Sequence, residues 1–212
     1  MICVSIAEPT AEECLSALEG VPFAEIRLDR MIVNENDVRR IFSARQGLIA
    51  ACRPGGLAAA TRKALLLAAV AAGASYVDIE IGSGQAYKRP IVAAARRAAC
   101  RIIVSYHNFG ETPPRSELEA VVERCFAAGA DVAKIACRVG SERDNARLLG
   151  LLDDPRPLAV MDLGGKGAKT RVMAALLGAA FVYASRGEGR ETAEGQIPQD
   201  RLASIIRTMG EI

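Results

Sequence analysis

Short apolar runs alternate with helix-like segments along the whole sequence, and this alternation limits the fold more than any other feature. Apolar runs of this length indicate strands, and the longer Ala/Leu-rich segments indicate helices. We predict strands at 2–6, 23–28, 47–51, 76–80, 101–106, 132–136, 157–162 and 181–184. We predict helices at 11–18, 35–43, 57–72, 86–98, 115–128, 141–151, 169–177 and 200–209. Eight strand–helix units in series predict an α/β fold, a single-domain (β/α)8 TIM barrel over residues 1–212.

A doubly wound open sheet is the competing architecture for alternating strands and helices. Its nucleotide-binding fingerprint needs glycines in the first strand–helix turn. Here that turn is Ala7-Glu8-Pro9-Thr10, without glycine. The barrel is therefore favoured, in a compact form with short loops, because such barrels typically have about 250 residues.

Composition excludes several classes of function. The 27 basic and 25 acidic residues give a net charge of +2, which offers no case for nucleic-acid or membrane partners. The sequence starts directly with a strand and has no long uncharged apolar window, so we expect a cytoplasmic protein. Six scattered cysteines without a CxxC pair predict buried reduced thiols, and with one histidine they predict no metal site.

Lys134 lies in the middle of the apolar run 132–136, the only lysine of the chain within such a strand. A buried ammonium ion must be paired or lose its proton, because burying it unpaired is expensive. A neutral amine would be a nucleophile. The alternative is a lysine that pairs with a carboxylate or reaches the strand end.

Charged residues alternate with apolar ones in two of the predicted strands. Glu25, Arg27 and Asp29 alternate in this way, and so do Asp78 and Glu80. The outer face of a barrel strand packs on helices, so the charges should point to the barrel interior or its mouth, together with Lys134. These charges either fill the interior as ion pairs or form a site at the C-terminal strand ends.

The single histidine, His107, follows Ser105-Tyr106 at the end of the strand before the lysine strand. A lone histidine is often structural, but strand ends are where barrel enzymes carry their catalytic groups. We therefore expect His107 and Lys134 to face one substrate.

Two later segments suggest ligand contacts. The glycine-rich turn 164–171 opens a helix, and its backbone N–H groups with Arg171 favour an anion, either phosphate or carboxylate. The polar stretch 185–196 is either a lid or a solvated loop.

Taken in order, these motifs resemble the type I 3-dehydroquinate dehydratase family of the shikimate pathway. The motifs that carry the resemblance are Glu25-x-Arg27-x-Asp29, Asp78-x-Glu80, Ser105-Tyr106-His107-Asn108-Phe109, Ala133-Lys134-Ile135-Ala136, Gly164-x-x-Gly167-x-x-Thr170-Arg171 and Thr192-Ala193-x-Gly195-Gln196. The resemblance implies a lyase that dehydrates 3-dehydroquinate to 3-dehydroshikimate through a lysine Schiff base, without metal or cofactor. It also suggests a homodimer.

The resemblance assigns roles to residues of this sequence. Lys134 would form the iminium that acts as an electron sink, and His107 would act as general base and acid. Arg171 would bind the substrate carboxylate. The remaining substrate-binding residues would be Glu25, Arg27, Arg53, Thr192 and Gln196.

The sequence departs from the family pattern at several positions. No glutamate precedes Gly55-Gly56, where the family has one that orients the histidine, and Leu163 replaces a common methionine. Thr192 replaces a serine, and Glu194 stands where proline is usual.

Two other functions remain open from the sequence. One is a class I aldolase that uses the same lysine on a phosphorylated substrate. The other is a catalytically inactive barrel that acts as a binding protein or scaffold.

Overall fold

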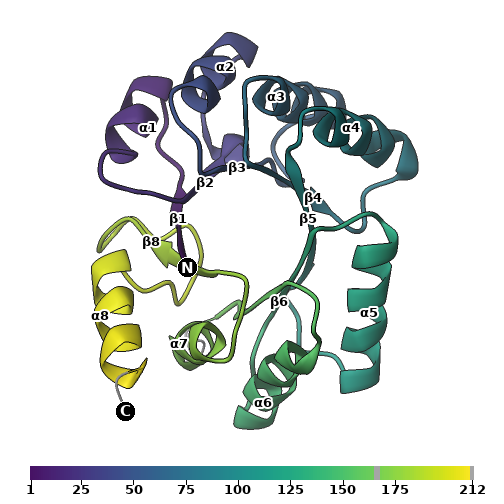
Figure 1. The fold of residues 1–212 in the computed structure, drawn as a ribbon, viewed down its shortest axis with the longest axis vertical. Coiled ribbons are helices and arrows are strands. Elements are labelled where there is room, and N and C mark those ends of the chain that lie inside the picture. Colours follow the sequence, from purple (N-terminus) through teal and green to yellow (C-terminus); the bar gives the residue numbers. More distant parts are fainter. Residues whose placement is uncertain (165–167, 211–212) are drawn as a thin grey trace. The chain divides into compact units, whose positions relative to one another are not determined.

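The computed structural model describes residues 1–164 and 168–210, and strands alternate with helices throughout these ranges (Figure 1). The strands are β1 (Ile2–Ile6), β2 (Ala24–Arg27), β3 (Leu48–Ala51), β4 (Tyr76–Glu80), β5 (Arg101–Asn108), β6 (Val132–Cys137), β7 (Leu158–Asp162) and β8 (Val182–Ser185). The α-helices are α1 (Ala11–Ala17), α2 (Glu35–Ser43), α3 (Ala59–Ala71), α4 (Gln85–Arg97), α5 (Arg115–Ala127), α6 (Glu142–Gly150), α7 (Ala168–Leu176) and α8 (Gln199–Gly210). Two 3₁₀ turns are η1 (Leu28–Arg30) and η2 (Leu151–Asp153). The predicted elements are confirmed, with ends that differ by at most about two residues.

The strands form one sheet in the order β7-β6-β5-β4-β3-β2-β1-β8. Pairing is parallel between β2 and β3, between β3 and β4, and between β6 and β7. The N–H of Ala180, just before β8, donates to the carbonyl of Leu158 at the start of β7 over 2.8 Å. Strands that neighbour in sequence therefore neighbour in the sheet. This order is that of a (β/α)8 barrel, so the predicted fold class is confirmed.

The chain divides into two compact units, Met1–Val4 with Val104–Ile212, and Ser5–Ile103. Each unit has its own buried apolar residues. Ile135 and Val160 are examples in the first unit, and Ile26 and Ile49 in the second. All six cysteines of the chain are buried, as the sequence predicts.

Polar caps place the helix starts. At the start of α1, the hydroxyl of Thr10 accepts a hydrogen bond from the Glu13 N–H over 3.2 Å, and the Glu13 carboxylate accepts from the Thr10 N–H over 3.1 Å. The same reciprocal arrangement begins α2 and α6. Such caps satisfy N–H groups that have no partner within the helix. After α5, Gly129 has a φ of 93°, a conformation that glycine adopts without steric cost.

The C-terminal end of β2 differs from the prediction. The alternation of charged and apolar residues predicts a strand through Leu28, but β2 ends at Arg27 and Leu28 begins η1. The carboxylate of Asp29, in this turn, accepts hydrogen bonds from the side chain of Arg27 and from the backbone N–H of Arg53. In this turn Asp29 contacts two arginines instead of continuing the strand.

In the part of the chain that the structure describes, no helix has both the length and the apolar character needed to cross a bilayer.

Candidate active site

Lys134 lies at the centre of β6, a strand whose six residues are all buried. Its side chain leaves the strand next to Ala159 of β7, and the residue is 3% exposed. The small side chain of alanine at that paired position leaves room for the longer lysine. The amine is therefore enclosed by protein, as the apolar neighbours of Lys134 predict.

Tyr183 of β8 contacts this amine. The Nζ atom of Lys134 lies 4.0 Å from the centre of the Tyr183 ring. The ring is held by an edge-on contact with Phe181, with centroids 5.6 Å apart and planes at 69°. Attraction between a cation and a ring face is worth about 2 kcal/mol when both are desolvated. Tyr183 was not among the predicted residues, because no pattern in the sequence couples this aromatic residue to the lysine.

His107 lies on β5, beside the lysine strand, and its position follows from the register. The N–H of Arg138 donates to the carbonyl of Asn108 over 2.8 Å, which in a parallel ladder pairs Asn108 with Cys137. His107 then pairs with Ala136, two residues beyond Lys134. Both side chains leave the same face of the sheet, about 7 Å apart along the strands.

The imidazole is half-buried and stacks on Phe109. The two ring centroids are 6.1 Å apart and the planes differ by 17°. Phe109 itself is 70% exposed. The Asn108 amide oxygen accepts from the N–H groups of Gly110 and Glu111, which turns the chain immediately after the histidine. His107 therefore lies at the C-terminal end of its strand, next to a tight turn.

Arg171, on α7, is buried and bonded to backbone carbonyls. Its Nε donates to Gly195 over 3.0 Å, Nη1 to Tyr183 over 3.4 Å, and Nη2 to Asp162 over 3.2 Å and Glu194 over 3.5 Å. These bonds engage four of the five N–H groups of an arginine. Burial lowers the pKa of Arg171 to about 10. Because this value is still well above 7, the guanidinium is charged at neutral pH. Two-pronged binding of a carboxylate by Arg171 would therefore replace at least one of these carbonyls.

Thr192 and Gln196 lie in the segment 186–197. The two ends of this segment come together at Ser185. The N–H of Ser185 donates to the carbonyl of Ile197 over 3.0 Å, closing the base of the segment. The backbone N–H and the hydroxyl of Thr192 both donate to Oε1 of Gln196, over 2.7 Å and 3.2 Å. The two residues predicted for the lid are thus bonded to each other, next to the carbonyls that receive Arg171.

The predicted anion-binding turn is described only in part. Gly165, Lys166 and Gly167 lie outside the described residues. The hydroxyl of Thr170 donates to Oδ1 of Asn145 over 2.6 Å, so it links α7 to α6.

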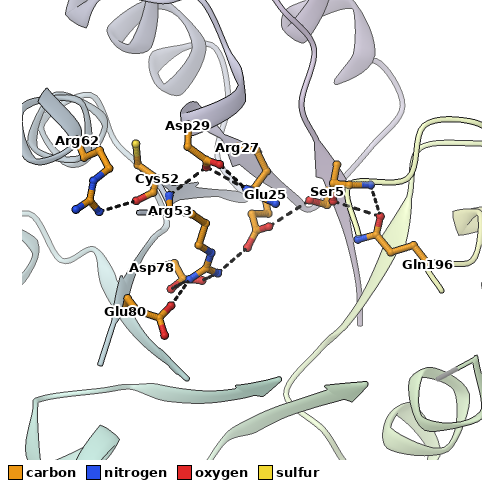
Figure 2. A network of polar contacts seen from close by, with 11 residues as sticks. Ser5, Glu25, Arg27, Asp29, Cys52, Arg53, Arg62, Asp78, Glu80 and Gln196 are labelled. Atoms are coloured by element: carbon orange, nitrogen blue, oxygen red, sulfur yellow. Dashed lines mark hydrogen bonds and ion pairs between the residues drawn. The ribbon is translucent and has the colours of Figure 1, made fainter. Parts of the chain in front are cut away.

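In the unit Ser5–Ile103, the predicted residues Glu25, Arg27 and Arg53 belong to one polar network (Figure 2). The Arg27 guanidinium donates twice to Asp29, over 3.1 Å and 2.8 Å. The hydroxyl of Ser5 donates to Glu25 over 3.2 Å. Ser5 was not among the predicted residues, although its alternation with Val4 and Ile6 could have indicated an interior polar position.

Burial and hydrogen bonding act in opposite directions on Asp29. Burial alone would raise the pKa of Asp29, but hydrogen bonds from the Arg27 guanidinium and from the Arg53 N–H hold that pKa below its usual value. Asp29 is therefore ionised at neutral pH and acts only as an acceptor.

Arg53 lies among three carboxylates. Its guanidinium bonds Asp78 over 2.6 Å and 3.3 Å and Glu80 over 3.1 Å, and it lies 3.9 Å from Glu25. Together with the Arg27–Asp29 pair, these contacts bring guanidinium and carboxylate groups into one network.

These groups define a class of protein, the (β/α)8-barrel enzymes that carry a buried lysine and a histidine on adjacent strands. Among the residues that the structure describes, no group of three or more His, Cys, Asp or Glu side chains could hold a metal ion.

Comparison with known proteins gives the family. Residues 2–212 match the family described as Type I 3-dehydroquinase, and the chain belongs to that family. The 3-dehydroquinate dehydratase of Desulfotalea psychrophila is 33% identical over 97% of this chain and 96% of its own length. That of Methanosarcina mazei is 28% identical, over 99% and 94%. The solved type I enzyme from Clostridium difficile has a TM-score of 0.86 at 22% identity and covers 99% of this chain and 92% of its own.

Proposed function

We propose that this chain dehydrates 3-dehydroquinate to 3-dehydroshikimate through a Schiff base on Lys134. The observation that carries the proposal is the family match over residues 2–212, together with a lysine that lies buried within strand β6. Eliminating water next to a ketone requires loss of a weakly acidic α-proton. An iminium in place of the ketone accepts the resulting electron pair. The lysine thus lowers the barrier to proton loss without a metal or cofactor.

The steps follow from the two side chains. The Lys134 amine adds to the ketone and one water leaves as the iminium forms. His107 takes the α-proton, the β-hydroxyl leaves, and the imidazolium returns the proton to that hydroxyl as water departs. A second water hydrolyses the iminium and frees Lys134, so the net reaction releases one water. The shared sheet face of Lys134 and His107 supports this division of roles.

The remaining predicted residues would bind the substrate. Glu25, Arg27 and Arg53 would contact ring hydroxyls and the carbonyl end, which suits a network rich in carboxylates. Arg171 would bind the substrate carboxylate, with Thr192 and Gln196 on the segment that covers it.

Reductive trapping tests the lysine. Treatment with borohydride and 3-dehydroquinate should inactivate the protein and add mass at Lys134, whereas Lys134→Ala should form no adduct and lose turnover. Lys169→Ala, which removes a surface lysine paired with Glu142, is the matched control and should keep both. An adduct elsewhere, or normal turnover by Lys134→Ala, would exclude the Schiff base. Sugar phosphates serve as the comparison substrates for an aldolase.

A second variant separates proton transfer from Schiff-base formation. His107→Ala should still give the Lys134 adduct but should dehydrate about 10²–10⁴-fold more slowly, the usual contribution of a positioned acid–base group. The rate of single-turnover dehydration measures this. Unchanged turnover would mean that another group removes the proton.

We also propose a homodimer, which the resemblance suggests, and, from the sequence pattern, a cytoplasmic location and one catalytic domain over residues 1–212. Light scattering after gel filtration checks the first proposal. A dimer should give twice the 22.4 kDa mass of one chain.

A further inference from the structure

Asn108 fixes the chain between His107 and Phe109. Its carbonyl accepts the N–H of Arg138 over 2.8 Å. Its side-chain amide donates to the hydroxyl of Tyr106 over 3.2 Å, and its Oδ1 accepts the N–H groups of the two residues after Phe109, over 3.0 Å and 3.1 Å. An asparagine that bonds the backbone ahead of it in this way defines a tight turn. The directions in which His107 and Phe109 leave the chain are therefore set.

A second anchor lies just beyond this turn. The hydroxyl of Thr112 donates to the carbonyl of Arg138 over 2.8 Å, and Thr112 is 5% exposed. Residues 109–111 thus lie between two hydrogen bonds to Arg138, which directly follows β6. The turn that carries Phe109 is held at the end of the strand that carries Lys134.

Phe109 is well anchored but stays in contact with water. Of the large apolar side chains that are exposed in the described part of the chain, it is the one aromatic residue, at 70%. A single exposed apolar side chain is common and alone has no meaning. This one, however, has its ring nearly parallel to the His107 imidazole, with centroids 6.1 Å apart and planes at 17°. The ring of Phe109 therefore covers one side of the imidazole.

The imidazole needs such a neighbour to keep one orientation. The torsion that turns a histidine ring about its own axis has broad minima, so the rotamer alone does not fix the ring plane. Offset, near-parallel rings attract each other at centroid distances of about 4.5–7 Å. A general base must also aim one ring nitrogen at the proton it removes. The stacked ring of Phe109 supplies a restraint of this kind.

We propose that Phe109 is a positioning residue for His107: its ring restricts the rotation of the imidazole and keeps the reacting nitrogen aimed at the proton that it transfers. The proposal rests on the function proposed above. Phe109 acts through His107, and Lys134 forms its Schiff base without it. Loss of the Phe109 ring therefore slows proton transfer but leaves substrate binding and Schiff-base formation unchanged.

Three substitutions of Phe109 test this role. Phe109→Ala should lower kcat about fivefold and leave KM within about twofold, because the change acts on a step after binding. Borohydride should still trap the Lys134 adduct. Phe109→Tyr keeps the flat ring and should have normal kcat, whereas Phe109→Leu keeps only the apolar character and should resemble Phe109→Ala. A raised KM in Phe109→Ala, or equal loss in Phe109→Tyr, would overturn the proposal.

The control is Ile32→Ala. It shortens another exposed apolar side chain, 85% exposed, and should leave kcat and KM as in wild type.

A double-mutant cycle tests whether Phe109 acts through the histidine. In a His107→Ala background, Phe109→Ala should change the single-turnover rate of dehydration by less than about twofold. The same fivefold loss with and without His107 would mean that Phe109 acts independently of the imidazole, which would overturn the proposal.

Nuclear magnetic resonance tests the stacking without reference to activity. The chain has one histidine, so the imidazole proton signals belong to His107 alone. A nuclear Overhauser effect between these protons and the ring protons of Phe109 is expected in wild type and in Phe109→Tyr. This measurement also decides the matter if circular dichroism shows that Phe109→Ala does not fold.

The outcomes separate this inference from the proposed function. A wild type without turnover and without a Lys134 adduct would overturn both. A wild type with normal turnover and a trapped adduct, but without the Overhauser effect between the two rings, would overturn this inference alone.

Discussion

At the scale of the residue, Asp29 links the two arginines of the polar network. Both of its oxygens receive the Arg27 guanidinium, and one also receives the Arg53 N–H. Its pKa in the folded protein lies below the usual value because these donors outweigh burial. An acid with a lowered folded pKa stabilises the fold above its unfolded pKa of about 3.9. That contribution is lost as the pH falls through the folded value.

This predicts the behaviour of Asp29→Asn. The variant should have a free energy of unfolding about 2 kcal/mol lower at pH 7, since a partly buried guanidinium loses its charged partner. The difference should shrink below about pH 4, where Asp29 becomes protonated in the unfolded wild type, and it should disappear only below the lower pKa of Asp29 in the folded protein. Urea denaturation at pH 7, 5 and 3 measures it, with the exposed Glu12→Gln as the control. A difference that stays constant down to pH 3 would contradict the assignment.

At the scale of the element, the sequence predicted best where local signals act. Residues 35–43 match α2 at both ends, because Asn34 supplies a cap before an amphipathic run. The strand 101–106 was predicted two residues short, since β5 continues through His107 and Asn108. The extra pairing depends on the N–H of Arg138, which directly follows β6, and no local pattern reveals this contact.

The contrast between local and non-local signals also explains which side-chain environments could be predicted from the sequence. The burial of Lys134 follows from its apolar neighbours. The bonds of Arg171 do not follow from the sequence, because its acceptors are carbonyls 9 to 24 residues away whose positions depend on the fold. The contact of Tyr183 with the amine is non-local in the same way.

Arg171 therefore makes a prediction for the segment 186–197. Arg171→Lys keeps the charge but replaces a planar set of donors by one ammonium, so the carbonyls of Glu194 and Gly195 should lose a bonded partner. Backbone amides of 186–197 should then exchange with deuterium about tenfold faster, while those of α4 should be unchanged.

Lys169→Ala on the same helix is the control for this experiment, since the exposed amine of Lys169 pairs with Glu142 of α6. It should leave the exchange of 186–197 as in wild type. Equal exchange in wild type and Arg171→Lys would mean that the closed base at Ser185 and Ile197 holds the segment without the arginine.

At the scale of the whole molecule, eight strand–helix units could be predicted because each repeats the same local signals. The division into two compact units could not, since it depends on which contacts the folded chain makes. The boundaries of the units fall inside β1, after Val4, and inside β5, after Ile103. Each boundary between the units therefore divides a strand, and we expect the two units to open together.

Buried cysteines allow a test of this cooperativity. Burial raises the pKa of Cys14, Cys52 and Cys137 to about 12, and the thiolate is the form that reacts. Each thiol should thus react with an aromatic disulfide reagent only after the surrounding structure opens. Cys52 belongs to the unit Ser5–Ile103 and Cys137 to the other. If opening is global, the two should be labelled in native buffer with rates within about twofold, after correction for their reactivity in urea. Mass spectrometry of each cysteine peptide measures both rates, and clearly separate rates would show that the two units open independently.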